Sequence, residues 1–97
     1  MIIRIVRMHF TDAGVDEFLS IFNTYKSAIR GVKGCTHLEL LKDVGTANTY
    51  TTLSYWEGPD HLEAYRKSVL FGMVWKQIKA CFSGPPQAFS LEKFMEV

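Results

Sequence analysis

The sequence has little cysteine, no excess of charge and no long hydrophobic run. Cys35 and Cys81 are the only cysteines and lie in no CxxC or Cys/His spacing, so neither a disulfide scaffold nor a structural zinc site is expected. We expect both to be buried as small apolar side chains. Two arginines interrupt the apolar start of the chain, and no stretch of about 18 apolar residues occurs. These absences favour a soluble, cytoplasmic protein without a signal peptide or a membrane partner.

The charges are balanced, with 11 Lys and Arg against 10 Asp and Glu. No basic stripe is present to neutralise phosphates, so nucleic acid is not an expected partner. The histidines have no metal-ligand spacing, and no GxGxxG, P-loop or GxSxG motif occurs. The sequence therefore predicts no metal site and no bound cofactor.

The chain is nevertheless rich in core material, because 47% of its 97 residues are hydrophobic. A protein of this mass leaves about 5,700 Å² exposed out of roughly 16,000 Å² in the unfolded chain. Without a repeat or a linker, residues 1–97 are expected to form a single domain.

Hydrophobic periodicity predicts an α+β fold. Strands are expected at 2–10, 35–43, 49–56 and 87–95, with a helix up to residue 30 and a helical region that breaks near Ser68. This β-α-β-β-α-β order is typical of the ferredoxin-like arrangement, a four-stranded antiparallel sheet with helices on one face. The other face would expose a large apolar patch, so a homodimer is the simplest expectation.

One segment carries a family resemblance. Residues 54–71 (SYWEGPDHLEAYRKSVLF) contain a Trp-Glu pair that ends the third strand and the helix break, and they follow a Gly34-Cys35 opening of the second strand and a turn at Gly14. With these features the chain resembles the antibiotic biosynthesis monooxygenase (ABM) family of dimeric α+β barrels. The resemblance implies that two sheets meet face to face, while each protomer keeps a cleft between its sheet and its helices.

The family includes haem-degrading enzymes. Aligned with that branch, its catalytic Asn falls on Arg7, its Trp on Tyr65 and its haem-ligating His on Trp75. An indole offers iron no lone pair, so haem degradation is not expected.

The aromatic-polyketide oxygenases of the family are a closer match. They place a Trp near the end of the third strand, here Trp56, and an Asn four residues earlier, where this chain has Thr52. Thr donates one hydrogen bond but lacks the paired donor and acceptor of an amide. The resemblance implies a cofactor-independent monooxygenase acting on a small planar substrate, phenolic or polyketide-like. The alternative is a non-catalytic dimeric barrel that binds small ligands or is associated with stress.

Arg7 and His9 are the candidate catalytic residues. The haem-branch alignment places Arg7 on the cleft face of the first strand, beside Ile3, Ile5 and His9. There its guanidinium would lower the pKa of a bound phenol or enol, with His9 as a proton acceptor. Alternatively, Arg7 pairs with an acid of its own or the partner chain, and His9 is structural or exposed to solvent.

The candidate substrate-binding residues are Thr52, Trp56, Tyr65 and Trp75. The two tryptophans are expected to form core or cleft walls, since an indole supplies area and one N–H donor but no acid or base. The Tyr65 hydroxyl could meet either a ligand or a backbone carbonyl. Thr52 and Trp56 share a strand face with Tyr50 and Ser54, a pattern that suits a planar ligand or a tolerant core.

Overall fold

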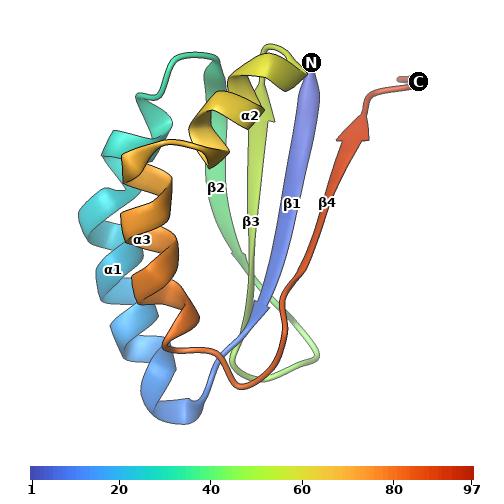
Figure 1. The fold of residues 1–97 in the computed structure, drawn as a ribbon. Coiled ribbons are helices and arrows are strands. Elements are labelled where there is room, and N and C mark those ends of the chain that lie inside the picture. Colours follow the sequence, from blue (N-terminus) through green and yellow to red (C-terminus); the bar gives the residue numbers. More distant parts are fainter.

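The computed structural model describes residues 1–97. Three helices lie on one face of a four-stranded sheet (Figure 1). The elements are, in chain order, β1 (Ile2–His9), α1 (Asp12–Arg30), β2 (Cys35–Lys42), β3 (Thr49–Trp56), α2 (Pro59–Arg66), α3 (Val69–Lys79) and β4 (Gln87–Glu92). The predicted order is confirmed, with the second helical region divided in two. None of the helices has the length and apolar character needed to cross a membrane.

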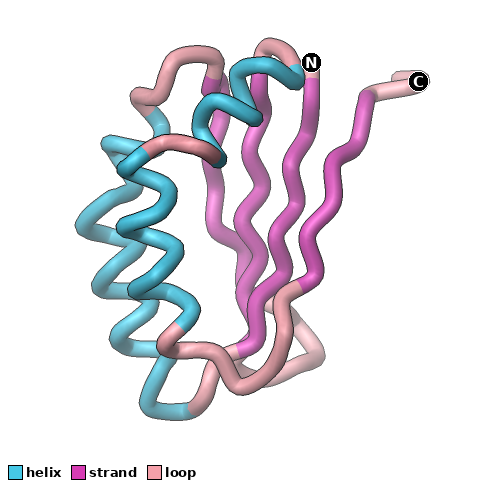
Figure 2. Tube along the Cα trace, viewed as in Figure 1, coloured by secondary structure: helices cyan, strands magenta, loops and turns pink.

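The sheet has the order β2-β3-β1-β4, and every neighbouring pair is antiparallel. This confirms the ferredoxin-like class, and Figure 2 shows the helices gathered on one side of the strands. β4 ends at Glu92, earlier than the predicted residue 95. The reason is that Glu92 pairs with Ile2, the first residue of β1, so no partner strand continues beyond it.

The break between α2 and α3 lies at Ser68, as predicted. The Ser68 hydroxyl donates to the Tyr65 carbonyl oxygen (2.6 Å) and accepts from the backbone N–H of Phe71 (3.1 Å). Ser68 therefore closes one helix and caps the next. Because a new helix starts here, α3 brings Phe71 and Trp75 to the same face of the sheet as Tyr65 of α2.

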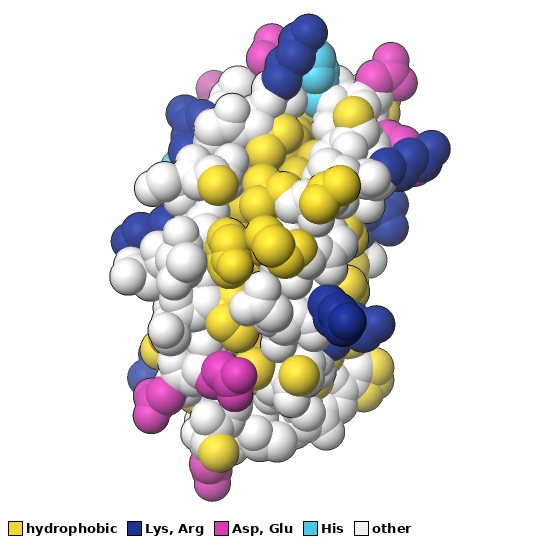
Figure 3. Space-filling model, turned by 60° about the vertical axis from the view of Figure 1, so that its left-hand side comes forward, with side chains coloured by type: hydrophobic (Ala, Val, Ile, Leu, Met, Phe, Trp, Pro, Cys, Tyr) yellow, Lys and Arg dark blue, Asp and Glu magenta, His cyan; other side chains and the backbone are white.

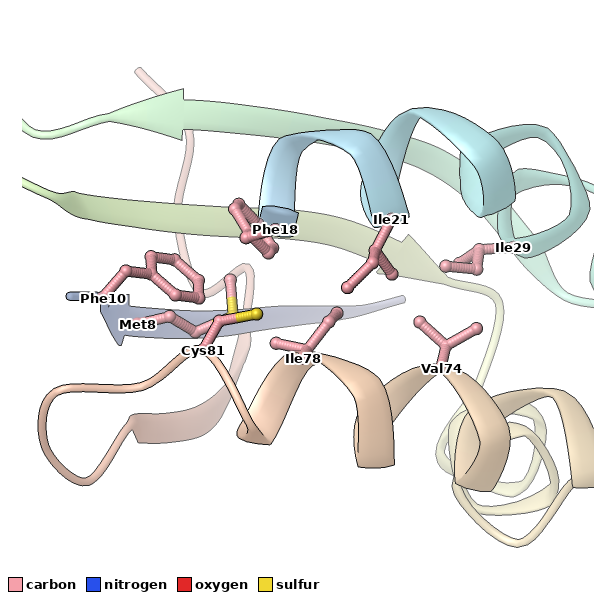
Figure 4. Packing of buried hydrophobic residues seen from close by; sticks show 8 residues of the cluster. All are labelled: Met8, Phe10, Phe18, Ile21, Ile29, Val74, Ile78 and Cys81. Atoms are coloured by element: carbon pink, nitrogen blue, oxygen red, sulfur yellow. The ribbon is translucent and has the colours of Figure 1, made fainter. Parts of the chain in front are cut away.

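The main core lies between β1, α1 and α3 (Figure 4). Its buried members are Met8, Phe10, Phe18, Ile21, Ile29, Val74, Ile78 and Cys81. Cys35 is buried in a second cluster with Trp56 and Leu62. Both cysteines are therefore buried, as expected, and burial raises the pKa of each thiol.

The two faces of β1 are the reverse of the predicted assignment. Arg4 and Met8 line the cleft between sheet and helices, so the alternating residues Arg7 and His9 lie on the open face, away from the helices. The prediction that Arg7 and His9 face the cleft is wrong. Side chains alternate with period two, so an alignment displaced by one residue moves a whole strand to the other face.

Candidate functional site

A cleft of about 130 Å³ lies between the sheet and the helices. On the helical side of the molecule, hydrophobic side chains gather in a band flanked by Lys and Arg (Figure 3). Thirteen of the 17 residues that line the cleft are hydrophobic. The lining includes Arg4, Val6 and Met8 of β1, Thr52, Ser54 and Trp56 of β3, Ala88 of β4, Tyr65 and Arg66 of α2, and Phe71, Val74, Trp75 and Ile78 of α3.

Stacked aromatic rings form one wall of the cleft. Trp56 stacks on Tyr65 with ring centroids 5.0 Å apart, Tyr65 meets Phe71 edge to face at 5.2 Å, and Phe71 stacks on Trp75 at 5.9 Å. Trp56 is only 1% exposed, and its indole N–H donates to the Ser54 hydroxyl oxygen (2.9 Å). Trp56 therefore contributes ring surface and leaves no free donor for a ligand.

Two hydroxyl groups of the cleft have no partner within the chain. Neither the Thr52 hydroxyl nor the Tyr65 hydroxyl forms a side-chain hydrogen bond in the protein. No fully buried side-chain polar atom lacks a partner, so these two hydroxyls are not fully buried. Burial raises the pKa of Tyr65 to about 12, with a smaller contribution from Cys35. The phenol therefore stays protonated at neutral pH and can donate a hydrogen bond to a ligand.

The cleft also contains two cations. Arg4 is half-buried, and its guanidinium donates to the Ser90 hydroxyl oxygen (3.2 Å) but forms no ion pair. Arg66 is more exposed and lies 3.8 Å from the Glu63 carboxylate. Burial, and then the charge of Arg66, lower the pKa of Arg4. No carboxylate or imidazole is among the residues that line the cleft.

Sequence reasoning missed Arg4, although a signal was present. Arg4 is the one charged residue on a strand face that is otherwise apolar, with Ile2, Val6, Met8 and Phe10. A charge in such a row is either at the edge of the core or has a function.

Arg7 and His9 lie together on the open face of the sheet. The Arg7 guanidinium donates to the Asp43 carboxylate (3.1 Å), a contact that holds the pKa of this acid below its usual value. The His9 ring lies 3.1 Å from the Thr49 hydroxyl through Nδ1 and 2.8 Å from the Gln87 side-chain oxygen through Nε2. Arg7 therefore forms an ion pair with an acid of its own chain, which was the alternative to a catalytic role. Neither Arg7 nor His9 lines the cleft.

The predicted substrate-binding residues do come together. Thr52, Trp56, Tyr65 and Trp75 all line the cleft, from one strand and two helices that are distant in the sequence. Their contact with a substrate stays a prediction. Trp75, at the position of the haem ligand in the family's haem-degrading branch, belongs to the aromatic wall, and no histidine lines the cleft.

The comparisons with known proteins give one family by sequence and one fold by structure. The sequence model described as "antibiotic biosynthesis monooxygenase" matches residues 1–77. No protein of curated function matches the sequence. Among solved structures, an antibiotic biosynthesis monooxygenase superposes with a TM-score of 0.89 at 14% identity, covering 98% of this chain and 100% of the other. A conserved protein from Methanosarcina mazei gives 0.89 at 17% identity, with 97% and 94% covered.

A third similar structure, from Bordetella bronchiseptica, is named as a candidate antibiotic biosynthesis monooxygenase. It has a TM-score of 0.85 at 22% identity, with 97% of both chains covered. At such identities the superpositions establish the fold alone, and the family assignment comes from the sequence match over residues 1–77. This chain belongs to the antibiotic biosynthesis monooxygenase family.

Proposed function

We propose that the protein is a monooxygenase that oxidises a small phenol or enol in the aromatic cleft, with the substrate itself supplying the electrons. The observation that carries this proposal is the cleft of about 130 Å³ walled by Trp56, Tyr65, Phe71 and Trp75. An apolar cavity of about 150 Å³ takes up a benzene molecule. The cleft is therefore suited to one aromatic ring, and a fused polycyclic substrate would need the Phe71–Trp75 wall to move.

The proposed reaction needs no external reductant. A phenol and O2 give a quinone and water: one oxygen atom enters the ring in place of hydrogen, and the other leaves as water with the two hydrogens that the substrate loses. The four electrons removed from the phenol reduce O2. The anion of the substrate transfers the first electron more readily than the neutral phenol, so the protein has to favour that anion and keep water away.

The cleft residues have distinct parts in this scheme. The stacked rings hold the substrate plane and exclude water, while the free hydroxyls of Thr52 and Tyr65 are available to orient an oxygen atom of the substrate. Arg4 takes the role of the fixed cation that the sequence had suggested for Arg7. Arg7 and His9 have no part, because they lie on the other side of the sheet.

Oxygen incorporation tests the proposal. Monocyclic phenols and hydroquinones are incubated with the protein and 18O2 in chelator-treated buffer, with oxygen uptake and product mass measured together. We expect one 18O atom in the quinone for each O2 consumed, whereas spontaneous oxidation of a hydroquinone to its own quinone leaves the label out. Binding of these substrates without enzyme-dependent incorporation of label would favour the alternative, a non-catalytic ligand-binding protein.

A matched pair of variants locates the reaction. Ala88 is exposed on β4 and lines the cleft, so Ala88→Trp is expected to fill the entrance and remove the activity. Ala64 is exposed on α2 outside the cleft, so Ala64→Trp should keep it. Equal activity of the two variants would place the reaction elsewhere.

We further propose that two copies of the chain associate through the open face of the sheet. Its central rows are apolar: Ile3 lies between Tyr55 and Leu91, and Ile5 between Leu53 and Phe89. Phe89 and Leu91 are each 47% exposed. The chain exposes 6226 Å², more than the roughly 5,700 Å² expected for a monomer of its mass. An apolar face of this kind is typical of a subunit interface.

Sedimentation at micromolar concentration is expected to give about twice the chain mass of 11.1 kDa. Ile5→Glu puts a charge at the centre of the open face and should give a folded monomer. Val69→Glu introduces the same charge at a residue of α3 that is 88% exposed and should leave the dimer intact. A wild-type monomer, or a dimer unaffected by Ile5→Glu, would contradict the proposed interface.

A further inference from the structure

We propose that Arg4 and Arg66 form an oxyanion-binding site at the mouth of the cleft, and that the ligand is a single aromatic ring bearing a phenolate or carboxylate group. This inference rests on the proposed function for the location of the ligand but not for its chemistry. It adds to the proposed function the charge of the ligand and the two side chains that would bind that charge.

Arg4 has more hydrogen-bonding capacity than the protein uses. In the sheet it lies between Ser54 of β3 and Ser90 of β4, and its guanidinium forms one side-chain hydrogen bond, to the Ser90 hydroxyl oxygen (3.2 Å). A guanidinium carries five N–H donors in a planar fork that fits a carboxylate or another oxyanion. Arg4 lines a cleft that contains no acidic side chain to use its remaining donors.

The side chains around Arg4 carry an excess of positive charge. Arg66 borders the same cleft, and its contact with Glu63 is long (3.8 Å) between side chains that are each about half exposed. Such a surface pair neutralises little charge. Burial and the charge of Arg66 lower the pKa of Arg4, which means that its charged form is disfavoured as the site stands. An anion bound at the mouth of the cleft would pair with both guanidinium groups and favour the charged form of Arg4.

The rest of the cleft favours an aromatic anion over an inorganic one. Beyond the two arginines the walls are mainly apolar and aromatic, and the free hydroxyls of Thr52 and Tyr65 offer further donors. No imidazole or carboxylate is present to remove a proton from a bound phenol. A substrate that is already anionic, or that ionises readily beside a guanidinium, therefore suits this site best.

The test uses 4-nitrophenol, because its phenolate absorbs visible light and reports its own ionisation. We expect its apparent pKa to fall when it binds to the wild-type protein, and the shift to disappear in Arg4→Gln. Affinity for the phenolate should fall roughly tenfold or more in Arg4→Gln, and by a smaller factor in Arg66→Gln because this residue is exposed. Arg7→Gln, on the same strand but the opposite face, should leave the binding unchanged.

Two further probes separate the sources of the anion. Benzoate against benzamide tests a carboxylate, and 4-nitrophenolate against nitrobenzene tests a phenolate, each at low and high salt. Preference for the charged member of either pair, lost in Arg4→Gln and weakened by salt, supports the site and tells which oxyanion it accepts. Equal binding of charged and neutral members, or an unchanged affinity in Arg4→Gln, would overturn the proposal.

These outcomes are independent of the oxygenase reaction. Binding of anions that depends on Arg4, without 18O incorporation into any substrate, would leave the anion site in place and reject the monooxygenase. Incorporation into neutral substrates that is unaffected by Arg4→Gln would reject the anion site and retain the monooxygenase.

Discussion

Replacing Gly34 by alanine is expected to lower the free energy of unfolding by about 3 kcal/mol. Gly34 has a φ of +90°, where a β-carbon costs roughly 1–2 kcal/mol. The added β-carbon would also lie 2.3 Å from Cγ of His61 and 2.4 Å from its Cβ, so the start of α2 would have to move. Thermal unfolding should show a fall in Tm of roughly 10 to 20 °C for a domain of this size.

Two variants separate the steric part from the backbone part. Gly34→Ala combined with His61→Gly removes the side-chain atoms that the new methyl group meets, and should recover the steric part of the loss relative to His61→Gly alone. Gly45→Ala, at a glycine with nothing within 4 Å of the added carbon, should change stability little. If Gly34→Ala had the Tm of the wild type, neither the positive φ nor the clash with His61 would destabilise the variant.

The position of Gly34 also connects stability to the cleft. Its carbonyl oxygen accepts from the backbone N–H of Glu57 (2.8 Å), directly after Trp56, and its α-carbon allows His61 of α2 to lie close. The same helix carries Tyr65 and Arg66 into the cleft. We therefore expect that a chain that tolerates Gly34→Ala would do so by displacing α2, and with it the aromatic wall.

Much of the fold was predictable because its signals are local. The strand at 49–56 and the cap at Ser68 depend on neighbouring residues, and the structure has both where the sequence predicts them. The burial of Cys35 and Cys81 was likewise predictable, because nothing near them in the sequence offers them a chemical role.

The face of β1 was not predictable in the same way. Period two divides the strand into one set with Arg4 and another with Arg7, and the Arg4 set is the more apolar. Both sets contain isoleucine, however, and both faces were expected to be covered, one by helices and one by a second sheet, so isoleucine on a face does not assign it to the helices. Only the pairing with β3 and the packing of α1 and α3 decide it. An alignment to remote relatives chose the wrong set, and the candidate cation moved with it from Arg4 to Arg7.

The second large effect that we expect is a loss of stability in alkaline solution, caused by Tyr65. Its pKa is about 12 in the folded protein, against about 10 in an unfolded chain. Below pH 10 both states hold the phenolic proton and the stability is complete. Between pH 10 and 12 the unfolded chain loses the proton while the folded one keeps it, so the free energy of unfolding falls as pH rises, by between about 2 and 3 kcal/mol over the interval.

Tyr65→Phe removes this proton, so the variant should lose less stability than the wild type between pH 10 and 12. Its ring can still stack on Trp56 and meet Phe71, which keeps the wall of the cleft. Urea unfolding at several alkaline pH values measures the difference, and an ultraviolet titration of tyrosinate should lack its last step in the variant. If the free energy of unfolding of the wild type and of the variant fell in parallel with pH, the Tyr65 hydroxyl would ionise in the folded state as it does in the unfolded chain. That result would contradict the burial of the Tyr65 hydroxyl in the aromatic wall, because burial is the main cause of its raised pKa.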